Sequence, residues 1–168
     1  MDENLSIHRR EGLGLASIMA RRGVLHDDVA AALGLAKLPE GPSFVQMNGL
    51  LLLGTGPGTW LAMQDGAQPD WATDLAAAVQ PLASVSDQSG GYAVFRLEGS
   101  DARRLLQRGA SIDLHPEVFV PGSAATSVIS HIGAIFWCVD EGPTYDIAIF
   151  RSYARSFQHW LDATMAAL

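Results

Sequence analysis

The apolar positions in the first half of the chain follow strand and helix periods in turn. Residues 13–20 (LGLASIMA) predict a strand, and residues 24–35 predict a short, alanine-rich helix. Two paired strands are expected at PSFVQMNGLLLLG and TWLAMQ, because a turn rich in glycine and proline separates these apolar runs. A helix over residues 70–82 and a strand at SVSD follow. The predicted order is strand, helix, strand, strand, helix, strand.

The second half of the chain repeats this order after Ser89-Gly90-Gly91. Residues 92–99 predict a strand and residues 100–109 a helix. The remaining predicted elements are three strands and a last helix, at ATSVISHIG, AIFWCVD, YDIAIFR and 152–168. The segments GPGTWLAMQ and EGPTYDIAIF are alike, since each has Pro and Thr at a turn before a helix that carries tryptophan. This likeness indicates an internal duplication.

We therefore expect an α+β fold in which helices cover antiparallel or mixed sheets. The 168 residues are expected to form a single domain with pseudo-repeat halves at about 13–88 and 91–168. Residues 1–12 are mostly polar and are expected to be flexible or bound to a partner.

The composition narrows the classes of function. Hydrophobic residues make up 48% of the chain and charged residues 17%, which suggests that some apolar surface meets a partner. The formal net charge of -7 argues against binding to nucleic acid or to a membrane surface. One cysteine excludes a disulfide within the chain. Because neither a signal segment nor a transmembrane-length apolar run is found, we expect a cytoplasmic protein.

Motifs that suggest catalysis have simpler structural interpretations. GTGPGT (54–59) resembles a phosphate-binding loop, but a strand is predicted after it and Pro57 lacks an N–H donor, so a hairpin turn is favoured. Cys138 lies in the apolar run AIFWCVD and is expected to be a packed, inert thiol. No two of the five histidines stand three or four apart, so no metal site is predicted. No nucleophile with a partner base is recognised either.

Asp113, His115 and Glu117 stand two apart in the connection after the first predicted helix of the second half, residues 100–109. On a strand their side chains would point to one side, as a metal site or a proton-transfer site requires. Pro116 instead indicates an edge strand or a loop, in which Asp113 and His115 bind local backbone groups. The residues favour this structural interpretation.

Arg151 and Arg155 stand four apart at the predicted start of the last helix, so their side chains can share a face. Two cations at a helix N-terminus oppose the helix dipole. They are therefore expected to bind an acidic partner, another subunit or an anion. Pairing with Asp146 or Asp162 is an equal alternative.

Residues 84–109 resemble the opening of the aminomethyltransferase and folate-binding superfamily, which includes the T-protein of glycine cleavage. Its D-x-S-x-G … G-x-D-A pattern is matched by Asp87, Ser89, Gly91, Gly99, Asp101 and Ala102. Four segments in order resemble, more narrowly, the gamma subunit of heterotetrameric sarcosine oxidase: GSDARRLLQRG, IDLHPEVFVPG, IFWCVDEGPTYDI and FRSYARSFQHWL. This resemblance covers about residues 84–165, whereas residues 1–60 are supported only by the pattern of elements.

The resemblance implies a fold like the N-terminal folate-binding domain of the T-protein. It implies a non-catalytic gamma subunit that acts in the assembly of a complex. That complex would demethylate sarcosine oxidatively to glycine, with tetrahydrofolate as the one-carbon acceptor and hydrogen peroxide as a product. FAD, FMN, NAD, zinc and tetrahydrofolate would lie on other subunits and none on this chain. The partners would be the alpha, beta and delta subunits, chiefly alpha.

The motif and interface candidates are Asp101, Asp113, His115, Pro116, Arg151, Arg155 and Trp160. No catalytic, cofactor-binding or metal-binding residue is predicted. The K-G-C-Y-x-G-Q-E signature of the related iron–sulfur repair proteins and the Asn-Asp-Asp stretch of the aminomethyltransferases are not found. The alternative function is an independent folate or pterin binder related to the T-protein. A stand-alone transferase or hydrolase comes third.

Overall fold

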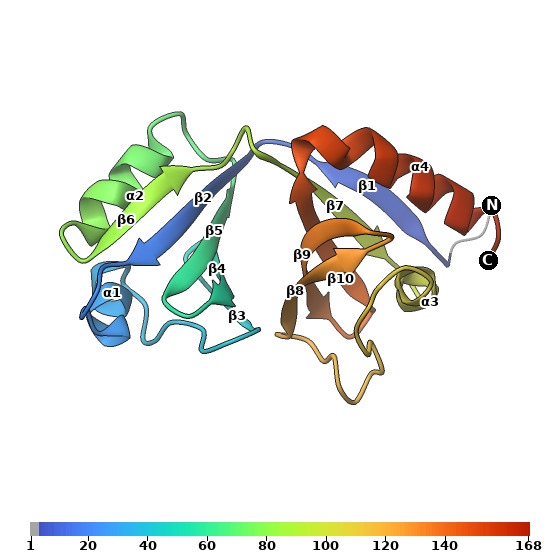
Figure 1. The fold of residues 1–168 in the computed structure, drawn as a ribbon, viewed down its shortest axis with the longest axis horizontal. Coiled ribbons are helices and arrows are strands. Elements are labelled where there is room, and N and C mark those ends of the chain that lie inside the picture. The colour runs from blue at the N-terminus through green and yellow to red at the C-terminus, as the bar shows by residue number, and fades with distance from the viewer. Residues whose placement is uncertain (1–3) are drawn as a thin grey trace. The chain divides into compact units, whose positions relative to one another are not determined.

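The computed structural model describes residues 4–168, which Figure 1 shows as a ribbon. The chain divides into two compact units. We call Gly12–Gly90 the middle unit. The terminal unit joins the residues up to Glu11 to Gly91–Leu168. Both ends of the chain therefore belong to one unit.

The middle unit is a five-stranded sheet with two helices. Its strand order is β3-β4-β5-β2-β6, and each neighbouring pair is antiparallel. The elements are β2 (Leu13–Ala20), α1 (His26–Ala32), β3 (Phe44–Met47), β4 (Leu50–Gly56), β5 (Thr59–Asp65), α2 (Trp71–Val79) and β6 (Ala83–Asp87). All the predicted elements of this half are found, but the strand count differs.

The stretch that was expected to be one strand before the glycine- and proline-rich turn is a hairpin. β3 and β4 pair on either side of Asn48-Gly49, whose φ angles are 52° and 83°. Two positive φ angles are what a tight hairpin turn requires, and Asn-Gly adopts them most readily. The predicted order was therefore one strand short in this half.

The terminal unit is also a five-stranded sheet with helices. Its strand order is β1-β7-β10-β9-β8, again with antiparallel neighbours. The elements are β1 (Ser6–Arg10), β7 (Tyr92–Glu98), α3 (Ala102–Gln107), β8 (Ala124–Ile129), β9 (Ile132–Asp140), β10 (Thr144–Phe150), the 3₁₀ turn η1 (Arg151–Tyr153) and α4 (Ala154–Met165).

β1 is the element that the sequence did not predict. Residues 1–12 were expected to be flexible, whereas Ser6–Arg10 pairs with β7 from Ser6↔Glu98 to Arg10↔Val94. Leu5 and Ile7 pack against the core of the terminal unit. Two alternating apolar residues among polar ones are too weak a signal for a strand. Residues 1–3 lie outside the described part of the chain.

From β2 and from β7 onward, both units run strand, helix, three strands, helix, and each sheet has one further edge strand. In the middle unit the final strand, β6, follows α2 and pairs with β2. In the terminal unit β1 takes this place beside β7, the counterpart of β2. The predicted α+β class with helix-covered sheets is confirmed, and the sheets are antiparallel rather than mixed.

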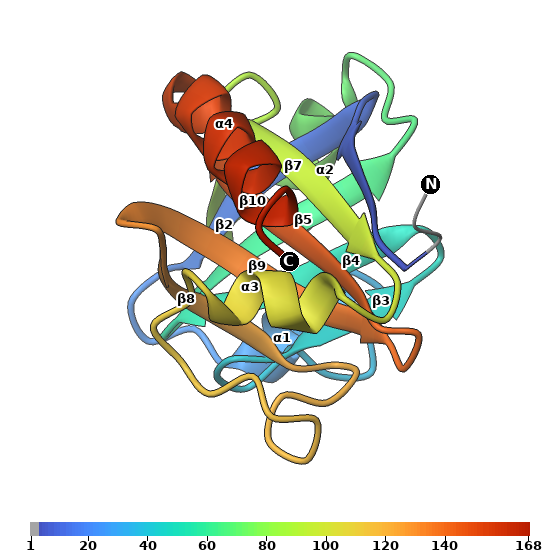
Figure 2. The ribbon, with the colours of Figure 1, turned by 90° about the vertical axis from the view of Figure 1, so that its right-hand side faces the viewer.

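Each unit has its own core between one face of its sheet and its two helices. In the middle unit, Val29 and Val79 of the helices pack with Ile18 and Leu52 of the sheet. The terminal unit has a larger core that includes Phe95, Leu105, Phe136, Ile147, Phe157 and Leu161. Figure 2 shows α3 and α4 over the same face of this sheet. Burying a leucine or phenylalanine stabilises by about 2 kcal/mol, so these cores fix where the surface residues lie.

Candidate interaction surface

Asp87 and Ser89 belong to the first part of the superfamily-like pattern. Their side chains form hydrogen bonds with backbone groups of the middle unit. The Ser89 N–H donates to Asp87 Oδ1 at 2.8 Å, and the Leu15 N–H donates to Ser89 Oγ at 3.0 Å. Ser89 Oγ in turn donates to the Leu15 carbonyl at 3.3 Å. The hydrogen bonds from Ser89 lower the pKa of the Asp87 carboxyl. This pair extends the contact between β2 and the end of β6.

Gly99, Asp101 and Ala102, the second part of the pattern, shape the entry to α3. Gly99 has a φ of 116°, and a Cβ there would collide with the Asn4 carbonyl. The Asp101 N–H donates to that carbonyl at 3.1 Å, and Ala102 is fully buried. The Asp101 side chain lies 3.8 Å from Arg104 as an exposed ion pair. Glycine is needed here for both its φ and the close approach of backbone.

Asp113, His115 and Pro116 lie in the connection between α3 and β8 and hold its turns. Asp113 Oδ1 accepts a hydrogen bond from the His115 N–H at 2.8 Å. His115 Nδ1 accepts one from the Glu117 N–H at 3.3 Å. The His115 carbonyl accepts from Val118 at 2.8 Å, across a turn in which Pro116 needs no N–H. The side chains of Asp113 and His115 thus accept hydrogen bonds within the loop.

Trp160 lies on α4 and packs inside the terminal unit. Its ring stands 5.6 Å from the Phe157 ring, centroid to centroid. A Cβ added to Gly109 would come within 2.5 Å of the Trp160 indole. The residue that seemed a surface candidate from sequence is therefore half-buried against the end of α3.

The glycine-rich segment GTGPGT and Cys138 were predicted to be a hairpin turn and a buried thiol, and both predictions are confirmed. GTGPGT is the hairpin turn between β4 and β5, with Gly56 paired to Thr59. Cys138 is fully buried in β9, and its thiol donates to the Asp140 carbonyl at 3.4 Å. Burial raises the pKa of the Cys138 thiol, and a protonated thiol is a poor nucleophile.

Sequence reasoning missed a buried ion cluster on the terminal sheet. Asp146 of β10, whose side chain is 1% exposed, accepts three hydrogen bonds of 2.7 Å. One comes from Arg10 of β1 and two from Arg96 of β7. The partners are up to 136 positions apart in sequence, so no local pattern could reveal them. The cluster joins three neighbouring strands, including β1.

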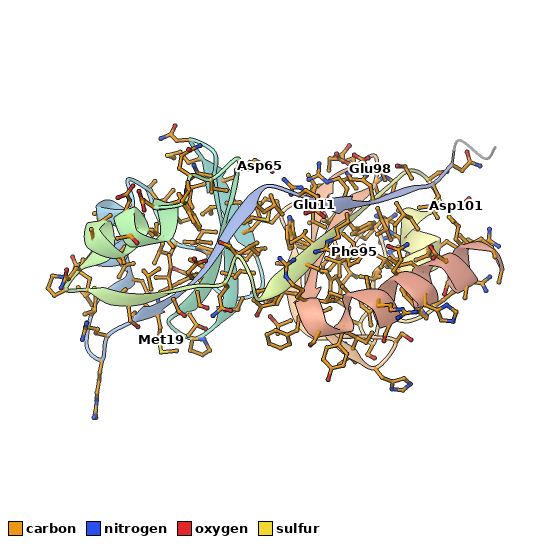
Figure 3. All side chains as sticks on the ribbon, turned by 90° about the horizontal axis from the view of Figure 1, so that it is seen from above. Glu11, Met19, Asp65, Phe95, Glu98 and Asp101 are labelled. Atoms are coloured by element: carbon orange, nitrogen blue, oxygen red, sulfur yellow. The ribbon has the colours of Figure 1, made fainter. Side chains whose placement is uncertain are left out.

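A surface hollow of about 610 Å³ lies on the terminal unit, and we call it the α4 hollow. Its lining comes from β1, β7, η1 and α4: Arg9, Phe95, Arg151, Ser152, Ala154, Arg155, Gln158, His159 and Asp162. In Figure 3 the labelled Phe95 lies between β1 and α4. Of the seven motif and interface candidates, all within the described residues, the hollow includes Arg151 and Arg155.

The charges in the α4 hollow are mostly positive. Arg151 donates to the Tyr92 carbonyl at 3.1 Å, and Arg9 pairs with Glu11 at 3.2 Å. Asp146 bonds Arg10 and Arg96, so the expected alternative of pairing with the helix-start arginines is not found for Asp146. Asp162, the other candidate partner, accepts from Gln158 at 2.8 Å. Arg9 was missed from sequence because β1 was not predicted.

Within residues 4–168, no three or more His, Cys, Asp and Glu side chains are grouped so that they could hold a metal ion. No helix among these residues combines the length and the apolar character that crossing a membrane would require.

Solved structures define the class of this fold. The glycine cleavage system aminomethyltransferase T from Bartonella henselae matches with a TM-score of 0.68 and 15% identity. The match covers 94% of this chain and 45% of that protein. The chain therefore has the α+β fold of the T-protein and corresponds to under half of that larger molecule.

A second solved structure and a family model narrow the class. A chain of the heterotetrameric sarcosine oxidase from Corynebacterium sp. U-96, solved with pyrrole 2-carboxylate, matches with a TM-score of 0.87. It is 26% identical, and the match covers 97% of this chain and 84% of that one. The model of the sarcosine oxidase gamma subunit family matches residues 23–167, and the chain belongs to this family. No curated protein sequence matches it.

Proposed function

We propose that this chain is a non-catalytic gamma subunit of a heterotetrameric sarcosine oxidase and that it acts in the assembly of that complex. The observation that carries the proposal is the family match over residues 23–167. The likeness to a chain of the Corynebacterium complex over 97% of this chain supports it. Family membership favours this role over that of an independent folate or pterin binder.

The contacts of the motif residues support a structural role. Ser89, Asp113 and His115 bind backbone groups close to them, and Gly99 admits the Asn4 carbonyl. The Cys138 thiol is buried, and its pKa is raised by that burial. Side chains that form hydrogen bonds with nearby backbone, and a buried protonated thiol, are not placed for proton transfer to a substrate or for nucleophilic attack. The chain would then contribute to the complex through surface contacts with the other subunits.

The complex that we propose demethylates sarcosine to glycine with tetrahydrofolate as the one-carbon acceptor and forms hydrogen peroxide. FAD, FMN, NAD, zinc and tetrahydrofolate would be held by the other subunits. The partners would be the alpha, beta and delta subunits, chiefly alpha, in the cytoplasm.

Co-expression tests the proposal. The full chain is expressed with the three partner subunits, one of which carries an affinity tag, and the purified material is compared with that from cells lacking this chain. We expect the chain to co-purify, and the yield of the complex to fall when the chain is omitted. A chain that stays in the flow-through would contradict the proposal. Titration calorimetry of the isolated chain with tetrahydrofolate tests the alternative, for which heat of binding is required.

A further inference from the structure

The α4 hollow gathers positive charge on a chain whose formal net charge is -7. Arg9, Arg155 and His159 line it together with Arg151, and Asp162 is the acid among its lining residues. An acidic protein as a whole repels other acidic molecules. A local group of cations can nevertheless attract and orient an acidic segment at short range.

Arg155 is the residue whose surroundings point most clearly to a missing counterion. Its side chain is exposed and makes no hydrogen bond or ion pair with any of residues 4–168. It lies in the first turn of α4, where no acidic residue offsets the helix dipole. A cation in this place is unfavourable in the isolated chain, and a carboxylate that binds the guanidinium removes the conflict.

The hollow is better suited to an extended segment than to one small anion. Its lining from Arg151 to Asp162 follows η1 and about two and a half turns of α4, which together are roughly 18 Å long. Tyr153 of η1, between the lining residues Ser152 and Ala154 in the chain, is 50% exposed, whereas Phe150 stacks on Tyr92 outside the hollow. Exposed aromatic residues next to arginine are the composition of protein–protein interfaces.

We propose that the α4 hollow docks an acidic segment of a partner subunit, with carboxylates of that segment bound by Arg155, Arg9 and His159. This inference rests on the proposed gamma-subunit function. It adds the place on this chain that the partner meets and the chemistry of the contact. The half-exposed Tyr153 of η1, next to the lining residue Ser152 in the chain, would cover an apolar part of the same segment.

Charge reversal at Arg155 tests the inference. The full chain is co-expressed with its partner subunits, and its retention on the tagged complex is measured over a series of salt concentrations. Arg155→Glu is expected to lower retention by roughly tenfold at equal salt, and His159→Glu to lower it less. Arg22→Glu is the matched control, because Arg22 is an exposed arginine of the middle unit outside the hollow.

The fold of the main variant is not at risk. A glutamate in the first turn of α4 agrees with the helix dipole, so the melting temperature of Arg155→Glu should equal or exceed that of the unmodified chain. Circular dichroism checks this. Lost retention with an intact fold therefore reports the contact itself.

Three outcomes overturn the inference. Unchanged retention of both Arg155→Glu and His159→Glu refutes it while leaving the proposed function standing, as does an equal loss for Arg22→Glu. Release of the chain by inorganic phosphate, beyond that by chloride at equal ionic strength, would make the hollow a small-anion site instead. Failure of the unmodified chain to bind the complex refutes the proposed function itself.

Discussion

The middle and terminal units share one order of elements, but their sheets are completed by strands of different origin. β6 follows α2 directly and pairs with β2, and the exposed hydrogen bond from Ser89 to Asp87 lies at its end. β1 comes from the other end of the sequence and is held beside β7 by the buried Asp146 cluster. The chain between the paired strands is of similar length in the two units, since Ala20 pairs with Ala83 and Arg10 with Val94, so it is the buried cluster rather than loop length that distinguishes β1. The difference teaches that the N-terminal residues are part of the terminal unit's framework.

Removing the buried carboxylate should give the largest effect. Asp146→Asn replaces the group that accepts three charge-assisted hydrogen bonds from Arg10 and Arg96. We expect the free energy of unfolding to fall by about 3 kcal/mol, because breaking a buried ion cluster leaves its other members poorly solvated. Urea unfolding of the full chain measures it. A change below about 0.5 kcal/mol, the size typical of surface sites, would show that β1 does not depend on this cluster.

A matched pair of glycines compares the packing of the two units. A Cβ at Gly109 would stand 2.5 Å from the Trp160 ring, and one at Gly14 would stand 2.7 Å from the Trp71 ring and 2.5 Å from the Ala67 Cβ. Gly109→Ala and Gly14→Ala should each lower the free energy of unfolding by about 2 kcal/mol, because a packed indole cannot move aside freely.

Gly133→Ala is the control for this pair, since nothing lies within 4 Å of its added Cβ. It should be neutral or slightly stabilising. If only one of Gly109→Ala and Gly14→Ala lowers the stability in thermal unfolding, the two units do not share this packing of a tryptophan against backbone.

The pair at the end of β6 should give the smallest effect, and that effect should depend on pH. The folded-state pKa of Asp87 is below its ordinary value of 3.8, so its stabilising effect is present above that value and is lost as the pH falls through the lower folded-state pKa. Asp87→Asn keeps an acceptor oxygen but removes the charge. We expect a small loss of stability at pH 7 and a smaller one in urea unfolding at an acidic pH below 3.8. If Asp87→Asn loses the same stability at both pH values, the negative charge of Asp87 is not the cause, and the altered hydrogen-bonding group is.

The same comparison shows what could be predicted from the sequence. The strands and helices after residue 12 have clear apolar periods, and the repeated order made the duplication visible. The β3–β4 hairpin was missed although Asn48-Gly49 is a strong turn signal, because the apolar run around it was taken as continuous. β1 could not be predicted, since its place depends on pairing with β7 and on Asp146, 136 positions from Arg10.

The candidate residues show the same limit. The four-residue spacing of Arg151 and Arg155 indicated a shared face, and both line the α4 hollow. Arg9, which faces them from β1, could not be anticipated without that strand. Trp160 belonged to a recognisable motif, but only the packing against Gly109 reveals that it supports the fold.

The central claim is that this chain contributes structure and contacts rather than reacting groups, and His115 tests it most directly. His115 carries the imidazole that looked most like a proton-transfer group, and its Nδ1 accepts a hydrogen bond from the loop backbone. The measurement is sarcosine-dependent hydrogen peroxide production per mole of assembled complex that carries His115→Ala. We predict turnover equal to that of the unmodified complex, with any loss confined to stability or yield of assembly. Abolished turnover in a fully assembled complex would contradict this account.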